Sequence, residues 1–197
     1  MKINILITTL LVLIFNSCDK KIETKIENLK KDTISINSNL DKNKSKTEVS
    51  YVKLDSNKYQ GKIYRELNEI DFFKSYSDAG GAMIDSYNGK DYCISHFYKN
   101  NKHLIVLNQI LKLDEQKVKY LALDMIEISG ISENTYLSFG LCRKNKNADS
   151  EIIAVHVNED EEYFNKILIA WRADRKKSMI YEIKSENIDC TNDGYGV

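Results

Sequence analysis

The sequence has no proline, three histidines, one tryptophan and eight glycines. So few imidazoles and glycines leave little material for a multi-histidine metal site or a phosphate-binding loop. The HExxH, GxSxG, P-loop and dinucleotide-binding patterns are all missing from it. It also has no CxxC pair, which excludes the common zinc-binding arrangements. We therefore expect no metal and no cofactor, and a catalytic site would have to be assembled from distant parts of the chain.

An excess of charge of either sign is lacking too. The chain carries 29 basic and 29 acidic residues, so its formal net charge is zero. Domains that bind nucleic acid normally show a basic face or an excess of lysine and arginine. We therefore expect no nucleic-acid partner.

The first eighteen residues have the layout of an export signal. Lys2 forms a short positive region, residues 3–15 are mostly apolar, and the small Ser17 directly precedes Cys18. A membrane-spanning helix needs about 20 apolar residues. The run is too short to remain in the membrane as a span, so we expect it to act as a signal.

The junction at Cys18 resembles the lipobox of bacterial lipoproteins, in which a small residue precedes a cysteine that receives diacylglycerol and becomes the new N-terminus. Phe15 stands where that pattern usually has leucine. The resemblance implies that residues 1–17 are a signal peptide and that Cys18 is lipidated. Two or more acyl chains hold a protein firmly on a bilayer. The protein is then expected in the bacterial cell envelope, with the outer membrane favoured; the alternative is an ordinary secretory signal with an incidental cysteine.

The region that follows Cys18 is charged, free of aromatic residues and poor in apolar pattern as far as residue 50. Such a segment buries too little apolar surface to offset the entropy lost on ordering. We predict that residues 18–50 are a flexible spacer and that residues 51–197 form a single globular domain.

An amphipathic helix is expected at the start of this domain. Ile63, Leu67, Ile70 and Phe73 recur at a spacing of three to four residues. The glycines that follow Asp78 supply the left-handed conformation in which many helices end.

A second helix competes with a hairpin after residue 158. Asn158 and Glu161 have the spacing of a capping box. In contrast, Ile169 and Trp171 alternate with polar or small positions in the manner of a strand. We predict a short helix over residues 159–165 and then a hairpin; one longer helix is the alternative.

The remaining segments alternate apolar and polar residues and are joined by short turns, which favours antiparallel neighbours. Asn88-Gly89, between two β-prone runs, is the strongest short hairpin signal. The predicted fold class is α+β, a curved antiparallel β-meander sheet with one or two packed helices.

Three cysteines remain once Cys18 is assigned to the anchor. Disulfides persist outside the cytoplasm, and the C-terminal tail around Cys190 has too little apolar pattern to stay folded unless it is tied down. We therefore predict a disulfide between Cys142 and Cys190. The alternative is three buried thiols that pack as small apolar groups.

Few side chains are candidates for chemistry. Cys93 and His96 lie three residues apart on a predicted strand, so their side chains point to opposite faces. His156 alternates with the apolar residues of its strand and is expected to face solvent. The acidic residues 159–162 lack the spacing of a calcium loop and predict a solvated helix start.

Recognition is the function that these features favour. Trp171, Arg172 and Tyr195 are the predicted recognition surface, because an aromatic ring with a polar group suits partly wet contacts. The twelve tyrosines also suit such contacts, but we favour the simpler explanation that tyrosine is a common strand residue. The hypothesis is a lipid-anchored, non-enzymatic envelope protein that binds another protein, of an inhibitor, immunity or accessory type.

Two alternatives come from other classes. An envelope glycan or peptidoglycan hydrolase would show two carboxyl groups about 5–10 Å apart in a cleft. A carbohydrate-binding module would show exposed, coplanar aromatic rings.

Overall fold

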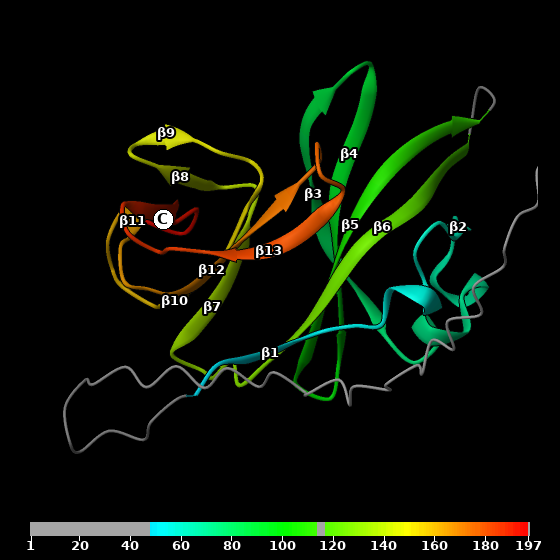
Figure 1. Cartoon of the computed structure of the whole chain (residues 1–197). Coiled ribbons are helices and arrows are strands. Elements are labelled where there is room, and N and C mark those ends of the chain that lie inside the picture. Colours follow the sequence, from blue (N-terminus) through cyan, green and yellow to red (C-terminus); the bar gives the residue numbers. More distant parts are fainter. Residues whose placement is uncertain (1–47, 114–116, 197) are drawn as a thin grey trace, which may run out of the picture. The chain divides into compact units, whose positions relative to one another are not determined.

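The computed structural model describes residues 48–113 and 117–196, which form a domain built almost entirely of β-strands (Figure 1). The predicted signal peptide, Cys18 and most of the predicted spacer lie outside the described residues. Val49 is buried, and strand β1 (Ser50–Lys53) begins at the next residue. The last residues assigned to the spacer therefore belong to the folded domain.

The largest sheet, here sheet A, has six antiparallel strands in the order β1-β6-β5-β4-β3, with β2 also paired to β6. Besides β1, its strands are β2 (Ile63–Tyr64), β3 (Ser77–Tyr87), β4 (Lys90–Lys99), β5 (Lys102–Leu113) and β6 (Lys117–Ser129). Asn88 and Gly89 link β3 to β4 with φ angles of 51° and 70°. Two successive positive φ angles give the tight turn whose twist matches that of the strands, so the predicted hairpin is confirmed.

Two smaller antiparallel sheets complete the domain. Sheet B has the order β13-β12-β10-β7, and its strands are β7 (Thr135–Phe139), β10 (Ile152–Val157), β12 (Ile167–Asp174) and β13 (Met179–Ile183). Sheet C has the order β11-β14-β8-β9, and its strands are β8 (Cys142–Lys144), β9 (Asn147–Ala148), β11 (Tyr163–Phe164) and β14 (Ile188–Thr191).

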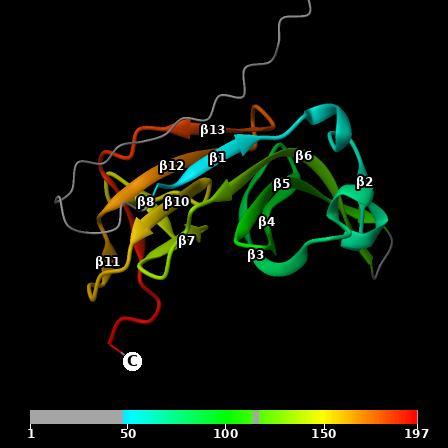
Figure 2. The ribbon, with the colours of Figure 1, turned by 90° about the horizontal axis from the view of Figure 1, so that it is seen from below.

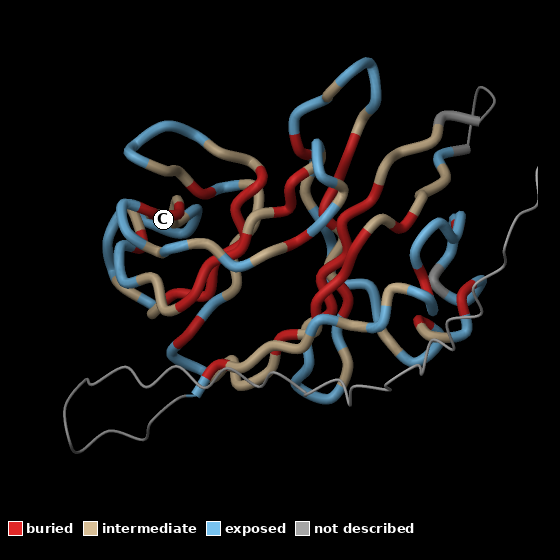
Figure 3. The backbone as a smooth tube through the Cα atoms, in the orientation of Figure 1, coloured by how far each residue is buried: buried red, intermediate tan, exposed pale blue. Residues whose placement is uncertain are grey.

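Sheet B is the middle layer, because its strands are apolar on both faces. Ile153 and Val155 on one face of β10 share a core with sheet A, whereas Ile152 and Ala154 on the other face pack with sheet C. A strand buried on both sides reads as a continuous apolar run. The Tyr51 hydroxyl of β1 donates a hydrogen bond to Glu182 of β13; Figure 2 views the two strands from below. Burial is concentrated along the central strands (Figure 3).

The second face of sheet A has its own cover, made by residues 54–76. A second core cluster joins Tyr59, Tyr64 and Phe73 of this segment to the side chains on that face of the sheet. One polar link between this segment and the rest of the domain is Asp124, which is 4% exposed. The Asp124 carboxylate accepts hydrogen bonds from the Tyr59 hydroxyl (3.0 Å) and the Ile180 backbone N–H (2.6 Å).

The α+β prediction is wrong, because helical structure in residues 48–113 and 117–196 is limited to three short 3₁₀ turns: η1 (Ser56–Lys58), η2 (Leu67–Glu69) and η3 (Asp71–Phe73). The first predicted helix does not form because its backbone groups make hydrogen bonds to β6. The Gly61 N–H donates to the Ala122 carbonyl, and the Ala122 N–H donates to the Lys62 carbonyl. Strand β2 then continues this pairing along β6, so Ile63 is 52% exposed instead of part of an apolar stripe.

The predicted helix over residues 159–165 is wrong as well. The Glu159 carboxylate accepts from the backbone N–H groups of Asn165 and Lys166, both at 3.2 Å, and so closes a loop instead of capping a helix start. Strand β11 lies within this loop and pairs with β14. The hairpin predicted beyond it is confirmed as β12 and β13, which excludes the single longer helix.

Candidate functional site

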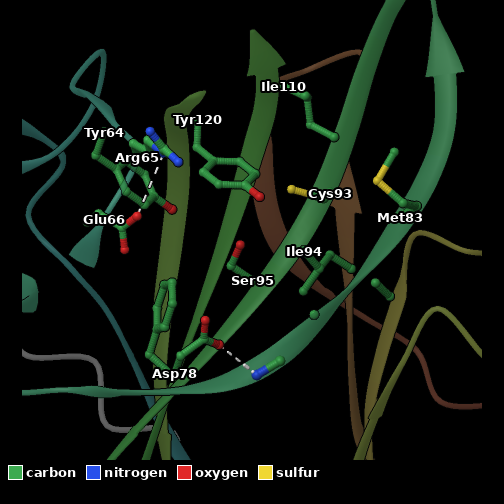
Figure 4. Close-up of a pocket in the computed structure, with 14 residues that line it drawn as sticks. Tyr64, Arg65, Glu66, Asp78, Met83, Cys93, Ile94, Ser95, Ile110 and Tyr120 are labelled. Carbon is green, nitrogen blue, oxygen red and sulfur yellow. Dashed lines mark hydrogen bonds and ion pairs between the residues drawn. The ribbon is translucent and has the colours of Figure 1, made fainter. Parts of the chain in front are cut away.

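A cavity of about 390 Å³ opens on the second face of sheet A, beyond the cover made by residues 54–76 (Figure 4). Its walls come from five strands of the sheet, β2 to β6, and from the two residues that follow β2. Tyr64, Arg65 and Glu66 stand on one side, and Met83 and Ile110 stand on the other. Sites for small ligands and side-chain anchors commonly measure about 300–1,000 Å³. This cavity is the candidate functional site.

The hollow exists because small residues lie side by side on the cavity face. Gly81 of β3 pairs with Ser95 of β4, and two residues further along Met83 pairs with Cys93. Since side chains of a strand alternate between faces, these four positions point the same way. A Cβ atom on Gly81 would lie 2.5 Å from the Ile94 carbonyl oxygen, so only glycine allows β3 to run this close to β4. The small floor leaves room above it.

A buried polar network lies behind the floor. The Tyr64 hydroxyl donates to Asn108 Oδ1 at 3.1 Å, and Asn108 Nδ2 donates to Ser95 Oγ at 3.0 Å. Asn108 is 0% exposed. Each of these groups has a partner, which is the requirement for burying polar groups without a large cost. The network fixes the orientation of the Tyr64 ring and the Ser95 hydroxyl in the cavity wall.

The groups deep in this wall are uncharged at neutral pH. Burial raises the pKa of the Cys93 thiol to about 11, and burial also raises the pKa of the Tyr64 hydroxyl. A thiol reacts as a nucleophile in its thiolate form, which needs a lowered pKa. Cys93 is therefore a cavity-lining group and not an activated nucleophile.

The charged groups of the lining are at the rim: the carboxylates of Glu66 and Asp78 and the guanidinium of Arg65. Arg65 Nε lies 3.7 Å from Glu66 Oε1, and both side chains are substantially exposed. Asp78 on strand β3 accepts a hydrogen bond from the Gly80 N–H at 2.8 Å. Gly80 has a φ of +100° in the bulge between Asp78 and Gly81, so the bulge aims Asp78 at the cavity. The rim carries a formal charge of −1.

The three histidines lie elsewhere and are held neutral. His96 Nε2 and His103 Nδ1 share a hydrogen bond of 3.0 Å, and burial lowers the pKa of His96 to about 4, with His103 as a second cause. The prediction that His156 faces solvent is wrong, because it is 0% exposed. Its ring stacks on Phe164 at 4.0 Å and bonds to Ser138 Oγ at 2.8 Å. Strand β10 packs against a hydrophobic core on each face. The alternating pattern of its sequence does not reveal the second core, in which His156 is buried.

The structure does not bring the predicted recognition residues together. Trp171 is 0% exposed in the core between sheets A and B, so the prediction that it forms part of a surface is wrong. Arg172 is engaged in ion pairs with Asp149 and Glu151. Tyr195 is 49% exposed and stands alone among the three as an accessible ring.

The cysteines are arranged as one disulfide and one thiol within the described part of the chain. Cys142 and Cys190 are opposite each other on β8 and β14 and are joined at an S–S distance of 2.06 Å, the pair that the sequence predicts. Cys93 is the free thiol. Across residues 48–113 and 117–196, no group of three or more histidine, cysteine or acidic side chains is placed to hold a metal ion.

Sequence reasoning missed the cavity. The pattern around Asp78, Gly80 and Gly81 predicts a helix end, whereas these residues form a bulged edge strand. The high frequency of tyrosine before residue 100 was the available signal, since Tyr64 lies in the wall. Its partner Tyr120 is 56 positions away along the chain, and only the sheet pairing Tyr64 to Tyr120 brings the two together.

No helix among the described residues is long and apolar enough to cross a membrane. A scan of the chain against protein-family models finds no match. Searches of curated proteins and of solved structures likewise find no similar protein. The function is therefore argued from the site.

Proposed function

We propose that this protein is a lipid-anchored component of the bacterial cell envelope, held through Cys18 and favouring the outer membrane, whose folded domain is a non-enzymatic module that binds another protein. An inhibitor, immunity or accessory role fits this description. The observation that carries the proposal is the preformed cavity beside an exposed edge strand. Its walls combine aromatic and aliphatic side chains with polar groups and a few charges at the rim, which is the composition of a recognition site.

The titratable groups of the domain support binding over catalysis. General acids and bases work best with a pKa near the working pH, whereas the pKa of His96 is lowered to about 4 and that of Cys93 is raised to about 11. His103 and His156 also have lowered pKa values because of burial. These groups are partners in packing and hydrogen bonding.

The anchor is tested by replacing Cys18 with alanine and following the protein in fractionated cells. Loss of the acyl chains removes the membrane affinity that they supply, so the variant is expected in the soluble fraction. A variant that stays with the membranes would contradict lipidation at Cys18. Cys93→Ala is the matched control and should fractionate like the unchanged protein.

The binding function is tested with the full chain carrying Cys18→Ala, immobilised and exposed to detergent extracts and culture supernatants of the producing cells and their competitors. One partner recovered in stoichiometric amount, which then forms a complex from purified components, is the expected result. No protein partner at low salt would overturn the protein-binding proposal.

A second candidate, a glycan-directed function, is favoured by one specific observation: Glu66 and Asp78 line the same cavity, as two carboxylates of a hydrolase or a sugar-binding module would. Glycan arrays and peptidoglycan hydrolysis assays test it. The Glu66→Gln and Asp78→Asn variants should then lose hydrolysis, while the exposed Asp85→Asn variant should keep it.

A further inference from the structure

We propose that the cavity is the receptor for a basic side chain, arginine or lysine, presented by the protein partner. In this arrangement the apolar stem lies between Tyr64 and Met83 and the charged head group reaches Asp78. The inference rests on the proposed function, because it names the chemistry by which the same site would recognise its partner.

Charge complementarity is the first argument. Among the charged groups that line the cavity, Glu66 is paired with Arg65. The Asp78 carboxylate has a backbone N–H as its partner in the described residues, and no cation lies within ion-pairing distance of it. An ionised carboxylate at the rim of an open cavity is a natural partner for a cation that brings charge-assisted hydrogen bonds. An anionic ligand would instead face a rim charge of −1.

The walls provide the second argument. Tyr64, Phe97 and Tyr120 contribute aromatic rings, and Met83 and Ile110 contribute flexible aliphatic surface. Arginine and lysine bury their methylene stems along such surface while the head group stays with polar partners. Aromatic rings add cation–π attraction for the head group. Burial keeps the Tyr64 hydroxyl in its neutral form, so the ring remains a hydrogen-bonding group without a charge of its own.

The cavity lies beside an edge strand, which favours a ligand that is a side chain of a polypeptide segment. Strand β3 stands at the end of the order of sheet A and pairs with β4 alone in residues 48–113 and 117–196. Its residues 77–81 are all exposed. Gly80 has open space where a Cβ would lie, so a second main chain can approach the strand at this point without a clash. A segment that lies along β3 can direct one side chain into the cavity.

The test uses Cys93 as a reporter inside the site. The chain has four cysteines, of which Cys142 and Cys190 are joined, so the full chain carrying Cys18→Ala retains Cys93 as its one free thiol. Alkylation of Cys93 by iodoacetamide is followed by mass spectrometry near pH 9, with blocked tripeptides whose central residue is arginine, lysine, citrulline, leucine or glutamate. The arginine and lysine peptides are expected to slow alkylation by about 5-fold or more at saturation, and the other three are not.

The matched variants are Asp78→Asn and Asp85→Asn, which remove the same charge from the same strand. The side-chain amide in Asp78→Asn keeps an oxygen that accepts from the Gly80 N–H, so the bulge is retained. Asp78→Asn loses a charge-assisted hydrogen bond, so its affinity for the arginine peptide should fall about 10-fold or more. Asp85→Asn should bind the peptide with the affinity of the unchanged chain. Equal protection by leucine or glutamate peptides, or an unchanged affinity in Asp78→Asn, overturns the inference.

Two further outcomes separate this inference from the proposed function. A captured protein partner that binds Asp78→Asn at full strength keeps the protein-binding function and overturns the basic-anchor site. Protection of Cys93 by peptidoglycan disaccharides and not by the cationic peptides overturns both in favour of a glycan site.

Discussion

The two faces of sheet A share the same strands but differ in the size of their side chains: one face is closely packed and the other contains the cavity. The face toward sheet B carries large aliphatic residues such as Ile94, Ile105 and Ile126, all nearly or fully buried against Trp171. The opposite face carries Gly81, Ser95 and Cys93 where the cavity opens. Close packing on one face therefore stabilises the sheet, and the residues opposite are free to stay small and form a site.

The largest expected effect is on the packed face. Trp171→Ala removes a fully buried ring that lies 5.2 Å from Tyr51, and it should lower the free energy of unfolding by about 3–5 kcal/mol in chemical denaturation. Met83→Ala on the cavity face, where the side chain is 61% exposed, should change it by about 0.5 kcal/mol or less. Equal losses would show that the two faces do not differ.

The next largest loss of stability is expected on removal of the disulfide of sheet C. Cys142 and Cys190 are separated by 48 positions, so their link removes considerable freedom from the unfolded chain. Replacing both with alanine should cost about 2–4 kcal/mol. Cys93→Ala, on the cavity face, should cost about 1 kcal/mol or less. If thermal and chemical denaturation gave the double variant the stability of Cys93→Ala, the C-terminal strand would not depend on its link.

An intermediate loss of folding stability is expected from changes to the Tyr64–Asn108–Ser95 network next to the cavity. Asn108→Ala leaves the Tyr64 hydroxyl and Ser95 without their buried partner, at a cost of about 1–3 kcal/mol. Adding Tyr64→Phe should recover part of this loss, because the orphaned hydroxyl is then gone. Strict additivity of the two changes in denaturation experiments would mean that the network does not act as a unit.

The last effect is absent at neutral pH and grows only in acid: it is the pH dependence of stability at the edge between sheets A and B, where His96 also contacts Phe139. His96 has a folded pKa of about 4, below the unfolded value of roughly 6.5. The unfolded chain therefore binds more protons in this window, so stability present above pH 6.5 is lost as the pH falls toward 4. His103 and His156 shift in the same direction. A titration by NMR that placed His96 near 6.5 would contradict this.

The contrast between the faces explains what sequence patterns predict. Alternation and Asn88-Gly89 are local signals, and both give the β3–β4 hairpin that the structure contains. The spacing of Ile63, Ile70 and Phe73 is equally regular, yet it produces no helix. Ile70 and Phe73 pack on a sheet face, and β6 takes the backbone groups of residues 61–64 that a helix would need.

The cavity and the burial of Trp171 depend on contacts between distant parts of the chain, which local sequence patterns do not reveal. Tyr64 and Tyr120 become neighbours through strand pairing. His156 and Trp171 are buried because sheet B lies between two other layers.

The sequence by itself determined the antiparallel hairpins, the neutral charge and the shortage of catalytic motifs, because composition, turn residues and alternation act over a few positions. The tertiary structure alone decided that sheet B is covered on both sides, that residues 54–76 cover sheet A instead of forming a helix, and that small residues from neighbouring strands leave a hollow beside Asp78. These features depend on which distant segments compete for the same backbone groups and apolar surface.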